Sequence, residues 1–404
     1  MKHNLFASLF ASAAVVFVVI GCVFLWIVVI HPSPTRQFLQ ELQGVLADPA
    51  TSPYVKRERS TELIPKYWRR IPAPEFLKVL TTLEGSQVSC HNLSHTVGKL
   101  VMRDSSNIAD AMSICGDSCR QGCFHGVLFQ LFGDQPELQH DPDAVPPNVP
   151  AWLGIQGPTN HITVKEIAAL LPGVCQKSAE MGHPVEECFH GFGHIFLMAL
   201  GTPQSALAYC GQSSNAHYRY HCAGGVFMQR EATTSTIMPT LAENFAICDY
   251  AGKVFSEAFA GCYRYTARLV MRNHPVAFHP QIAAYCDSLT GQSRLGCFHG
   301  YGFSISGLIY AGKVKLVDVC SAGTENDQKM CVDGAIWGVL AGVDLSTHTA
   351  KRMPTGLHPC WTFPKDSVLE QYCLSTVRDG FYGGRHDFAL YSAMDGGNDT
   401  EKKN

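Results

Sequence analysis

The pattern of apolar and polar residues along this chain is helical rather than strand-like. One run, residues 7–30, contains no charged residue. Beyond it, apolar runs such as 191–200 and 334–341 begin just after a cysteine, and shorter runs such as 205–210 lead up to the next cysteine. Alternation of β-branched residues, which is typical of strands, is scarce. The pattern therefore predicts an all-α chain.

The apolar run at residues 7–30 predicts a membrane anchor. Its 24 residues, at about 1.5 Å each, span about 36 Å, which is enough for a bilayer core of about 30 Å. A cleaved signal peptide has a shorter apolar region and a small-residue cleavage site, whereas His31-Pro32 follows here and Trp26 lies near that end. We expect an uncleaved signal anchor in the lipid bilayer, with residues 1–6 as a short cytoplasmic tail. The alternative is a long signal peptide that is removed.

Cysteines form a regular ladder along the rest of the chain. The sequence has 17 cysteines, of which Cys22 lies in the apolar run. Twelve of the other sixteen fall into short-range pairs separated by polar or glycine-rich loops. The pairs are Cys175/Cys188, Cys210/Cys222, Cys248/Cys262, Cys286/Cys297, Cys320/Cys331 and Cys360/Cys373. Cys90, Cys115, Cys119 and Cys123 remain, and four cysteines allow three connectivities. Their spacing favours Cys115–Cys123 with Cys90–Cys119.

The ladder also indicates a repeat. The second cysteine of each repeat unit is found at position 90, 123, 188, 222, 262, 297, 331 or 373. Successive positions are 33–42 residues apart, except for one interval of 65 residues. That period is typical of helix-hairpin repeats. We predict an N-terminal transmembrane helix followed by a disulfide-stapled array of helix hairpins, like an α-solenoid or an α/α-toroid. Disulfides require an oxidising compartment, so the bulk of the chain is expected in the periplasm, at the cell surface or in an organelle lumen.

The sequence also predicts where the parts of the chain after the membrane anchor begin and end. Residues 31–74 form a juxtamembrane linker with short helices such as 36–46. Residues 75–394 form the extracytoplasmic repeat domain, which contains a proline-rich insertion at 134–160. The tail at 395–404 is polar.

Histidines recur at one place in the repeat. Three second cysteines begin the same tetrapeptide, Cys-Phe-His-Gly, at Cys123, Cys188 and Cys297. We expect its glycine to let neighbouring helices approach closely, and its imidazole to lie in the first turn of a helix, where the macrodipole favours the neutral ring. Asp333 and Arg264 occupy the histidine's place in two other units, either as partners of a shared site or as sequence drift.

Some of these histidines are candidate metal ligands. His91 and His95, like His190 and His194, are four residues apart, so each pair lies on one face of a helix and can chelate an ion. The alternative is that repeat histidines tie one loop to the next. The candidate ligands are His91, His95, His125, His190, His194 and His299, and the remaining histidines are expected on the surface or in loops.

Composition and motifs exclude several classes of function. Charged residues make up 16% of the chain and the net charge is −3. The chain therefore lacks the excess of positive charge that is typical of nucleic-acid-binding proteins. The absence of C-x-x-C-H argues against covalent c-type haem. A near P-loop ends in Val314 where serine or threonine must bind magnesium, so no nucleotide is expected.

Two functions remain open. The first is a membrane-anchored helical-repeat scaffold that binds a protein partner on its repeat surface, as such arrays commonly do. The second is a metal- or haem-binding protein, an oxidoreductase among the options, that uses the histidines. Imidazole ligands suit copper, zinc or iron. The sequence does not determine the metal, or whether the protein is an enzyme.

Overall fold

The computed structural model describes residues 32–82, 90–132, 164–274, 278–341 and 358–383, apart from residues 49, 52, 106–107, 117–118, 120 and 235–236. These residues form 17 α-helices and one short 3-10 helix, and no strand occurs among them. The all-helical prediction is therefore confirmed for this part of the chain.

The first ten helices run from the N-terminal end to the middle of the chain. They are α2 (Pro34–Ala47), α3 (Pro53–Tyr67), α4 (Ala73–Thr81), α5 (Cys90–Asp104), α6 (Ile108–Cys115), α7 (Gly122–Phe132), α10 (Val164–Glu180), α11 (Val185–Leu200), α12 (Pro203–Cys210) and α13 (Ala216–Thr233).

The other helices complete the array. They are α14 (Leu241–Val254), α15 (Ala258–Asn273), α16 (His279–Ser288), α17 (Gly291–Tyr310), α18 (Leu316–Val319), α19 (Glu325–Ala341), the 3-10 helix η5 (Pro359–Thr362) and α20 (Val368–Gly383).

Local sequence signals mark the ends of many helices. Thr240 and Glu243 form a capping box at the start of α14, in which each side chain accepts from the other residue's backbone N–H, and this satisfies donors that a helix start leaves free. Gly201 ends α11 in the left-handed conformation, at φ 72°, which glycine adopts without a steric penalty. These signals are local, so they set helix boundaries before any tertiary contact forms.

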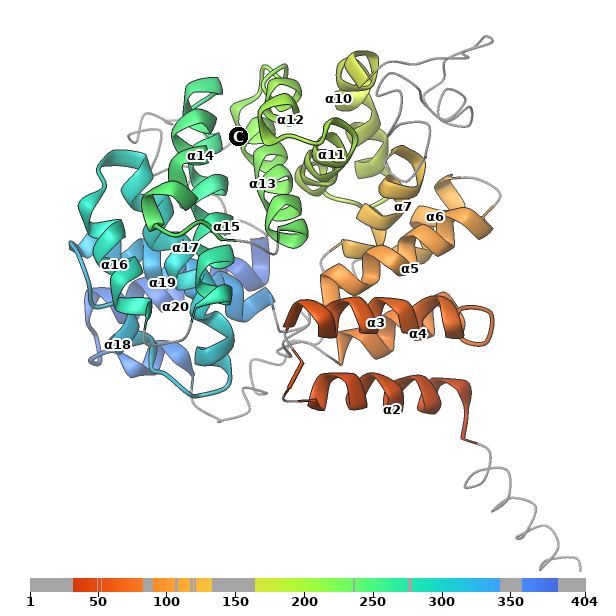
Figure 1. Ribbon diagram of the computed structural model, residues 1–404, viewed down its shortest axis with the longest axis horizontal. Coiled ribbons are helices and arrows are strands. Elements are labelled where there is room, and N and C mark those ends of the chain that lie inside the picture. Colours follow the sequence, from red (N-terminus) through yellow and green to blue (C-terminus); the bar gives the residue numbers. More distant parts are fainter. Residues whose placement is uncertain are drawn as a thin grey trace, which may run out of the picture.

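The helices follow one another around an arc, from α2 and α3 (red) through α11 and α13 to α19 and α20 (blue), as Figure 1 shows. Longer helices pack side by side in the order α5, α7, α11, α13, α15, α17, α19 and α20. The helices of the other layer, including α6, α10, α12, α14 and α16, each pack against the helix of this row that follows in the chain. The described residues share one continuous apolar core from Phe38 to Cys373. The fold is therefore a two-layer helical-repeat array.

Eight disulfides join the two layers. Six link the short-range pairs expected from the ladder: Cys175–Cys188, Cys210–Cys222, Cys248–Cys262, Cys286–Cys297, Cys320–Cys331 and Cys360–Cys373. The other two are Cys90–Cys119 and Cys115–Cys123, the pairing that spacing favoured. Each short-range bridge ties an element of one layer to the next helix of the other layer. Such bridges agree with an oxidising, extracytoplasmic environment.

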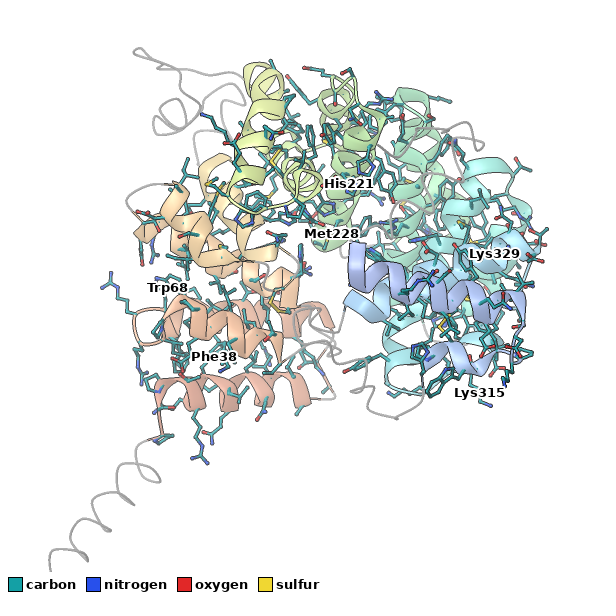
Figure 2. All side chains as sticks on the ribbon, turned by 180° about the vertical axis from the view of Figure 1, so that it is seen from behind. Phe38, Trp68, His221, Met228, Lys315 and Lys329 are labelled. Atoms are coloured by element: carbon teal, nitrogen blue, oxygen red, sulfur yellow. A yellow bond between two sulfur atoms is a disulfide. The ribbon has the colours of Figure 1, made fainter. Side chains whose placement is uncertain are left out.

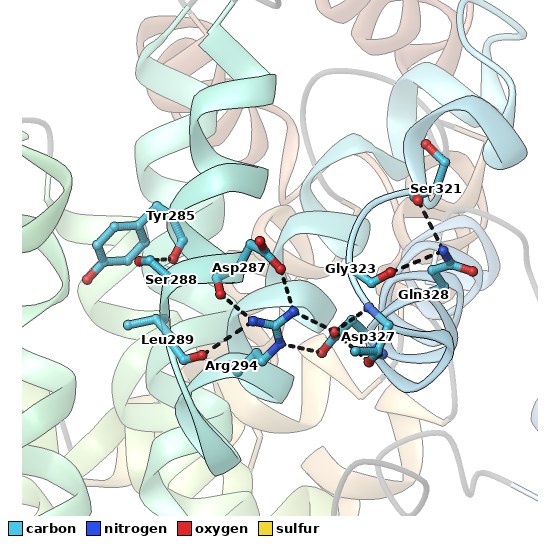
Figure 3. Close-up of polar contacts among 10 residues, drawn as sticks. Tyr285, Asp287, Ser288, Leu289, Arg294, Ser321, Gly323, Asp327 and Gln328 are labelled. Carbon is cyan, nitrogen blue, oxygen red and sulfur yellow. Dashed lines mark hydrogen bonds and ion pairs between the residues drawn. The ribbon is translucent and has the colours of Figure 1, made fainter.

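In several repeat units, the residue three positions before the second cysteine has a polar side chain that donates hydrogen bonds to the loop closed by the disulfide. Arg294 donates to the backbone carbonyls of Asp287 and Leu289, and Gln328 donates to those of Ser321 and Gly323 (Figure 3). Arg219 does the same for Ser213 and Ser214. The loops between layers are thus held by a covalent bond and by hydrogen bonds to otherwise free carbonyls.

Glycines allow the long helices to touch backbone to backbone, as expected. A Cβ at Gly193 would lie 2.0 Å from the carbonyl oxygen of Cys222, and one at Gly225 would lie 1.9 Å from that of His190. The same reciprocal contact recurs between α5 and α7, through Gly98 and Gly126, and between α17 and α19, through Gly302 and Gly334. No larger residue fits at these positions without moving a helix.

The N-terminal helices belong to the packed fold. The sequence analysis treated residues 31–74 as a linker, with a short helix at 36–46. The structure has α2, α3 and the start of α4 there, and α3 and α4 pack on α5. Phe38, Leu42 and Ile64 are fully buried in the common core, which is why these helices dock.

Several expectations fall on residues that the structure does not describe. They concern the tail 1–6, the anchor 7–30, the insertion 134–160 and the tail 395–404, all outside the described residues. Within the described part, no helix combines the length and apolar character needed to cross a bilayer.

Candidate metal centre

Five histidines from three long helices converge on one place. His91 and His95 lie on α5, His125 lies on α7, and His190 and His194 lie on α11. Neighbouring rings have centroids 4.6–5.8 Å apart, from His91–His95 at 4.6 Å to His95–His125 at 5.8 Å. We call these residues the histidine cluster. It contains five of the six ligands expected from the sequence.

His91, His95 and His125 present ligand atoms closest to one another. One nitrogen from each ring lies within 4.8 Å of the other two, and the Nε2 atoms of His91 and His95 are 3.1 Å apart. A tetrahedral ion with metal–nitrogen bonds of 2.0–2.1 Å separates its ligand nitrogens by about 3.3 Å. Small side-chain rotations therefore suffice to bring these three atoms around one ion.

Hydrogen bonds to carbonyl oxygens set which nitrogen of three rings carries the proton. His91 Nδ1 lies 3.1 Å from the carbonyl of Cys119, and His125 Nε2 lies 3.0 Å from that of Glu187. His194 Nδ1 lies 3.1 Å from Oε1 of the Gln229 side chain. Because these oxygens only accept, each of these nitrogens donates, and the other nitrogen of each ring keeps a lone pair. This is the arrangement that supports histidine ligands in metal sites.

Two of those lone-pair nitrogens are buried without a hydrogen-bond partner. They are His125 Nδ1 and His194 Nε2, in side chains that are 0% and 1% exposed. An unsatisfied buried polar atom costs about 1–3 kcal/mol. A bound ion would satisfy both nitrogens, and its unpaired, buried Nε2 makes His194 a candidate for a fourth ligand.

The cluster favours neutral imidazole. Burial holds the pKa of His95, His190 and His194 well below the usual value, and neighbouring histidines lower each further. A neutral ring is the form that binds metal.

One expectation about these rings was wrong. His125 is the fourth residue of α7, whereas His190 and His299 are the sixth and ninth residues of their helices. Burial, rather than the helix dipole, therefore accounts for the low pKa of His190.

Phe129 closes one side of the cluster. Its ring lies 4.7 Å from the ring of His95 and 5.5 Å from that of His194, between centroids. Gly191 of α11 lies against His125, because a Cβ there would come within 3.0 Å of the imidazole. Close packing of this kind keeps bulk water from the ligand atoms and orients the rings.

His299 does not join the histidine cluster. It lies on α17, and in the array α13 and α15 stand between α11 and α17. Its Nδ1 accepts from Arg264 Nε at 3.2 Å, and its Nε2 lies 3.2 Å from Asp333 Oδ2. The two residues that replace histidine in their own units thus pair with His299 in a separate buried polar group. Of the six candidate ligands, His299 is therefore the one that the structure places apart from the other five.

The sequence analysis missed Met228 and Gln229 of α13. Met228 Sδ lies 3.3 Å from His190 Nε2, and Gln229 holds His194. Met228 stands six residues after Cys222, as His194 stands six after Cys188 and Phe129 six after Cys123. Aligning the units on their second cysteines would have shown that this position faces the neighbouring helix.

A second group of histidines lies at the start of α13. His217 and His221 have ring centroids 4.5 Å apart, and His217 Nε2 lies 3.6 Å from Glu186 Oε1. The hydrogen bond to His217 lowers the pKa of Glu186 to about 2. His221 is 8% exposed and lies within α13, so the expectation of a surface or loop position was wrong for it. His183 is 3% exposed, but it lies in the loop before α11, as expected.

Comparison of the chain with protein-family models, with curated proteins and with solved structures finds no match. The geometry of the histidine cluster is therefore the best guide to the function of this protein.

Proposed function

We propose that this protein binds a transition-metal ion on the histidine cluster. His91, His95, His125 and His194 would supply the four ligands, each as a neutral imidazole. The observation that carries the proposal is the close approach of three ligand nitrogens, all within 4.8 Å of one another. Imidazole ligands suit copper, zinc, iron and nickel, so the ligand set limits the ion to this group.

The carbonyl contacts support a metal role over a purely structural one. A histidine that only ties two loops together needs partners on both nitrogens. His125 and His194 each have one partnered nitrogen, and the other is buried and free. Both free nitrogens belong to the histidine cluster, and an ion bound there would accept their lone pairs.

The proposal places the centre outside the cytoplasm. Eight disulfides support an oxidising compartment. Anchoring through residues 7–30 is part of the proposal, since that run has the length and composition of a transmembrane segment. Membrane fractionation followed by protease treatment of intact cells or vesicles tests the anchor and its orientation.

Metal analysis of the full chain tests the function. The protein is purified in detergent without chelators or a histidine tag, and its metal content and visible spectrum are measured. We expect about one ion per chain in a site of this ligand number, and its loss in the His125→Ala/His194→Ala double variant. His279→Ala on α16 is the matched control and keeps the ion.

A metal-free full chain that folds with native disulfides would contradict the proposal. That result would favour the scaffold function, in which the repeat surface binds a protein partner. Haem would instead appear as a strong visible absorption band that the same double variant changes.

A further inference from the structure

His190 is the member of the histidine cluster that lies between the four proposed ligands and α13. Its ring centroid is 5.4 Å from that of His125 and 4.9 Å from that of His194. On the other side, its Nε2 lies 3.3 Å from the Met228 sulfur. Figure 2 shows Met228 and His221 along α13, where this helix passes α11. The thioether of Met228 therefore lies next to the imidazole rings of the histidine cluster.

Gly224 leaves room beside this pair. It occupies the position two residues after the cysteine, where α7 has His125 and α19 has Asp333. A Cβ at Gly224 would already lie 3.4 Å from His190 Nδ1, so any larger side chain would fill the space next to the ring. The glycine keeps His190 and Met228 in contact with each other rather than with a third side chain.

The charge around the cluster favours a monovalent ion. Imidazoles and a thioether are neutral ligands, so the bound ion keeps its whole charge, and an uncompensated buried charge is costly. Glu187 Oε2 lies 3.5 Å from His125 Nε2, in a side chain that is 36% exposed, while the positive charge of Lys99 acts on His95. These nearby charges oppose each other, so a divalent ion would be more costly to bury here than a monovalent one.

We infer that the ion bound at this centre is monovalent copper, with Met228 and His190 as its ligands on the α13 side in place of two of the four imidazoles, so that the ion keeps four ligands. The inference rests on the proposed function above and adds the identity of the ion. Thioether sulfur is a soft ligand that selects Cu(I), whereas imidazole ligands alone are sufficient to bind zinc. Silver(I), which has the same charge and softness and no accessible redox change, is expected to bind in the same way.

The test uses the full chain in detergent with Cys22→Ser in every variant, because a free thiol also binds Cu(I) and Ag(I). Met228→Leu removes the sulfur and keeps nearly the same volume, so the fold is retained. Met271→Leu on α15 is the matched control. Affinities for Cu(I) are measured without oxygen by competition with a coloured chelator, and Ag(I) and Zn(II) are measured by titration.

We expect Met228→Leu to weaken Cu(I) and Ag(I) binding about tenfold or more, while Zn(II) binding changes less than about twofold. X-ray absorption of the Cu(I)-loaded protein should show sulfur next to the metal, and Met228→Leu should remove it. The control should leave both measurements unchanged.

Two results would overturn the inference in different ways. If Zn(II) binds but Met228→Leu leaves Cu(I) affinity and the sulfur signal unchanged, the centre exists and the ion assignment is wrong. If no ion of either kind binds to the folded parent chain, the proposed function fails as well.

Discussion

Glycine decides how closely the long helices approach. The reciprocal contacts of Gly302 with Cys331 and of Gly334 with His299 leave no room for a Cβ, since either would lie 1.9 Å from a carbonyl oxygen. The same contacts in the α5–α7 pair fix the distance between His95 and His125. The geometry of the proposed metal centre would thus depend on glycines that do not contact the ion.

Gly302→Ala should therefore destabilise the protein strongly. We expect a loss of about 3 kcal/mol, because α17 and α19 must move apart. Gly307→Ala on the same helix is the control. Nothing lies near its Cβ, so it should stabilise the protein by about 0.5–1 kcal/mol. Urea denaturation of both variants measures the difference, and equal effects would contradict the role of the contact.

In the proposed centre, Gln229 would act on the metal through His194. Replacing it with leucine removes the acceptor of His194 Nδ1–H and should lower metal affinity about 10–100-fold, as for other residues that orient a histidine ligand. The measurement is competition with a chelator for the ion, with Gln371→Leu on the distant α20 as control. Unchanged affinity in Gln229→Leu would show that His194 is not a ligand.

At the scale of elements, polar networks hold the starts of the long helices. The Arg294 guanidinium donates two hydrogen bonds to Asp327, at 2.9 and 2.8 Å, and also pairs with Asp287 (Figure 3). Asp327 accepts from the backbone N–H of Thr324 at 2.7 Å, which caps α19. One carboxylate thus joins α17 to the start of α19.

Stability should depend on pH through Asp327. Burial raises the pKa of this carboxyl, but hydrogen bonds from Arg294 and Thr324 outweigh burial and hold it below the usual 3.8. A lowered folded-state pKa contributes stability above pH 3.8 that is lost as the pH falls through the folded-state value.

The Asp327→Asn variant removes this contribution. It should be less stable at pH 7 by about 1.5–3 kcal/mol, the range for a hydrogen bond to a charged group, and its stability should fall less than that of the parent below pH 3.8. Asp287→Asn changes the exposed partner of the same arginine and should have an effect below about 1 kcal/mol. Parallel pH curves for the parent and Asp327→Asn would refute the assignment.

At the scale of the whole molecule, six short-range disulfides each tie one element to the helix that follows it, while the proposed metal centre would tie α5, α7 and α11 to one another. The histidine cluster draws on α5, α7 and α11. The segment between α7 and α10, residues 133–163, contains no cysteine, and no disulfide among the described residues links α5, α6 or α7 to the helices that follow. A bound ion would therefore cross-link the array where the disulfide ladder is interrupted.

Metal should accordingly raise the melting temperature. Ion at about 100 times its Kd adds about 2.7 kcal/mol to the free energy of unfolding when it binds only the folded state. The upward shift should disappear with chelator and in His125→Ala/His194→Ala, while His279→Ala behaves like the parent. Calorimetry of the full chain measures it. An equal shift in the double variant would place the ion elsewhere.

Much of the fold was predictable because its signals are local. Cysteine spacing indicated a repeat period, a compartment and all eight pairings, since each short-range bridge closes a loop of about a dozen residues. The glycines of the repeats indicated close helix contacts. Docking of α2, α3 and α4 was missed, because short amphipathic helices look the same in a linker and in a packed fold.

The site was predictable only in part. The spacing of His91 and His95 and of His190 and His194 identified two chelating pairs, because residues four apart share a helix face. The sequence alone thus determined the helices, their period, their covalent staples and the histidines available as ligands. Only the curvature of the array decided that residues 91 and 194 meet, that His299 pairs with Arg264 and Asp333 instead, and that Met228 reaches His190. Such contacts depend on how successive helices rotate against one another, which is set by packing across the core rather than by local spacing.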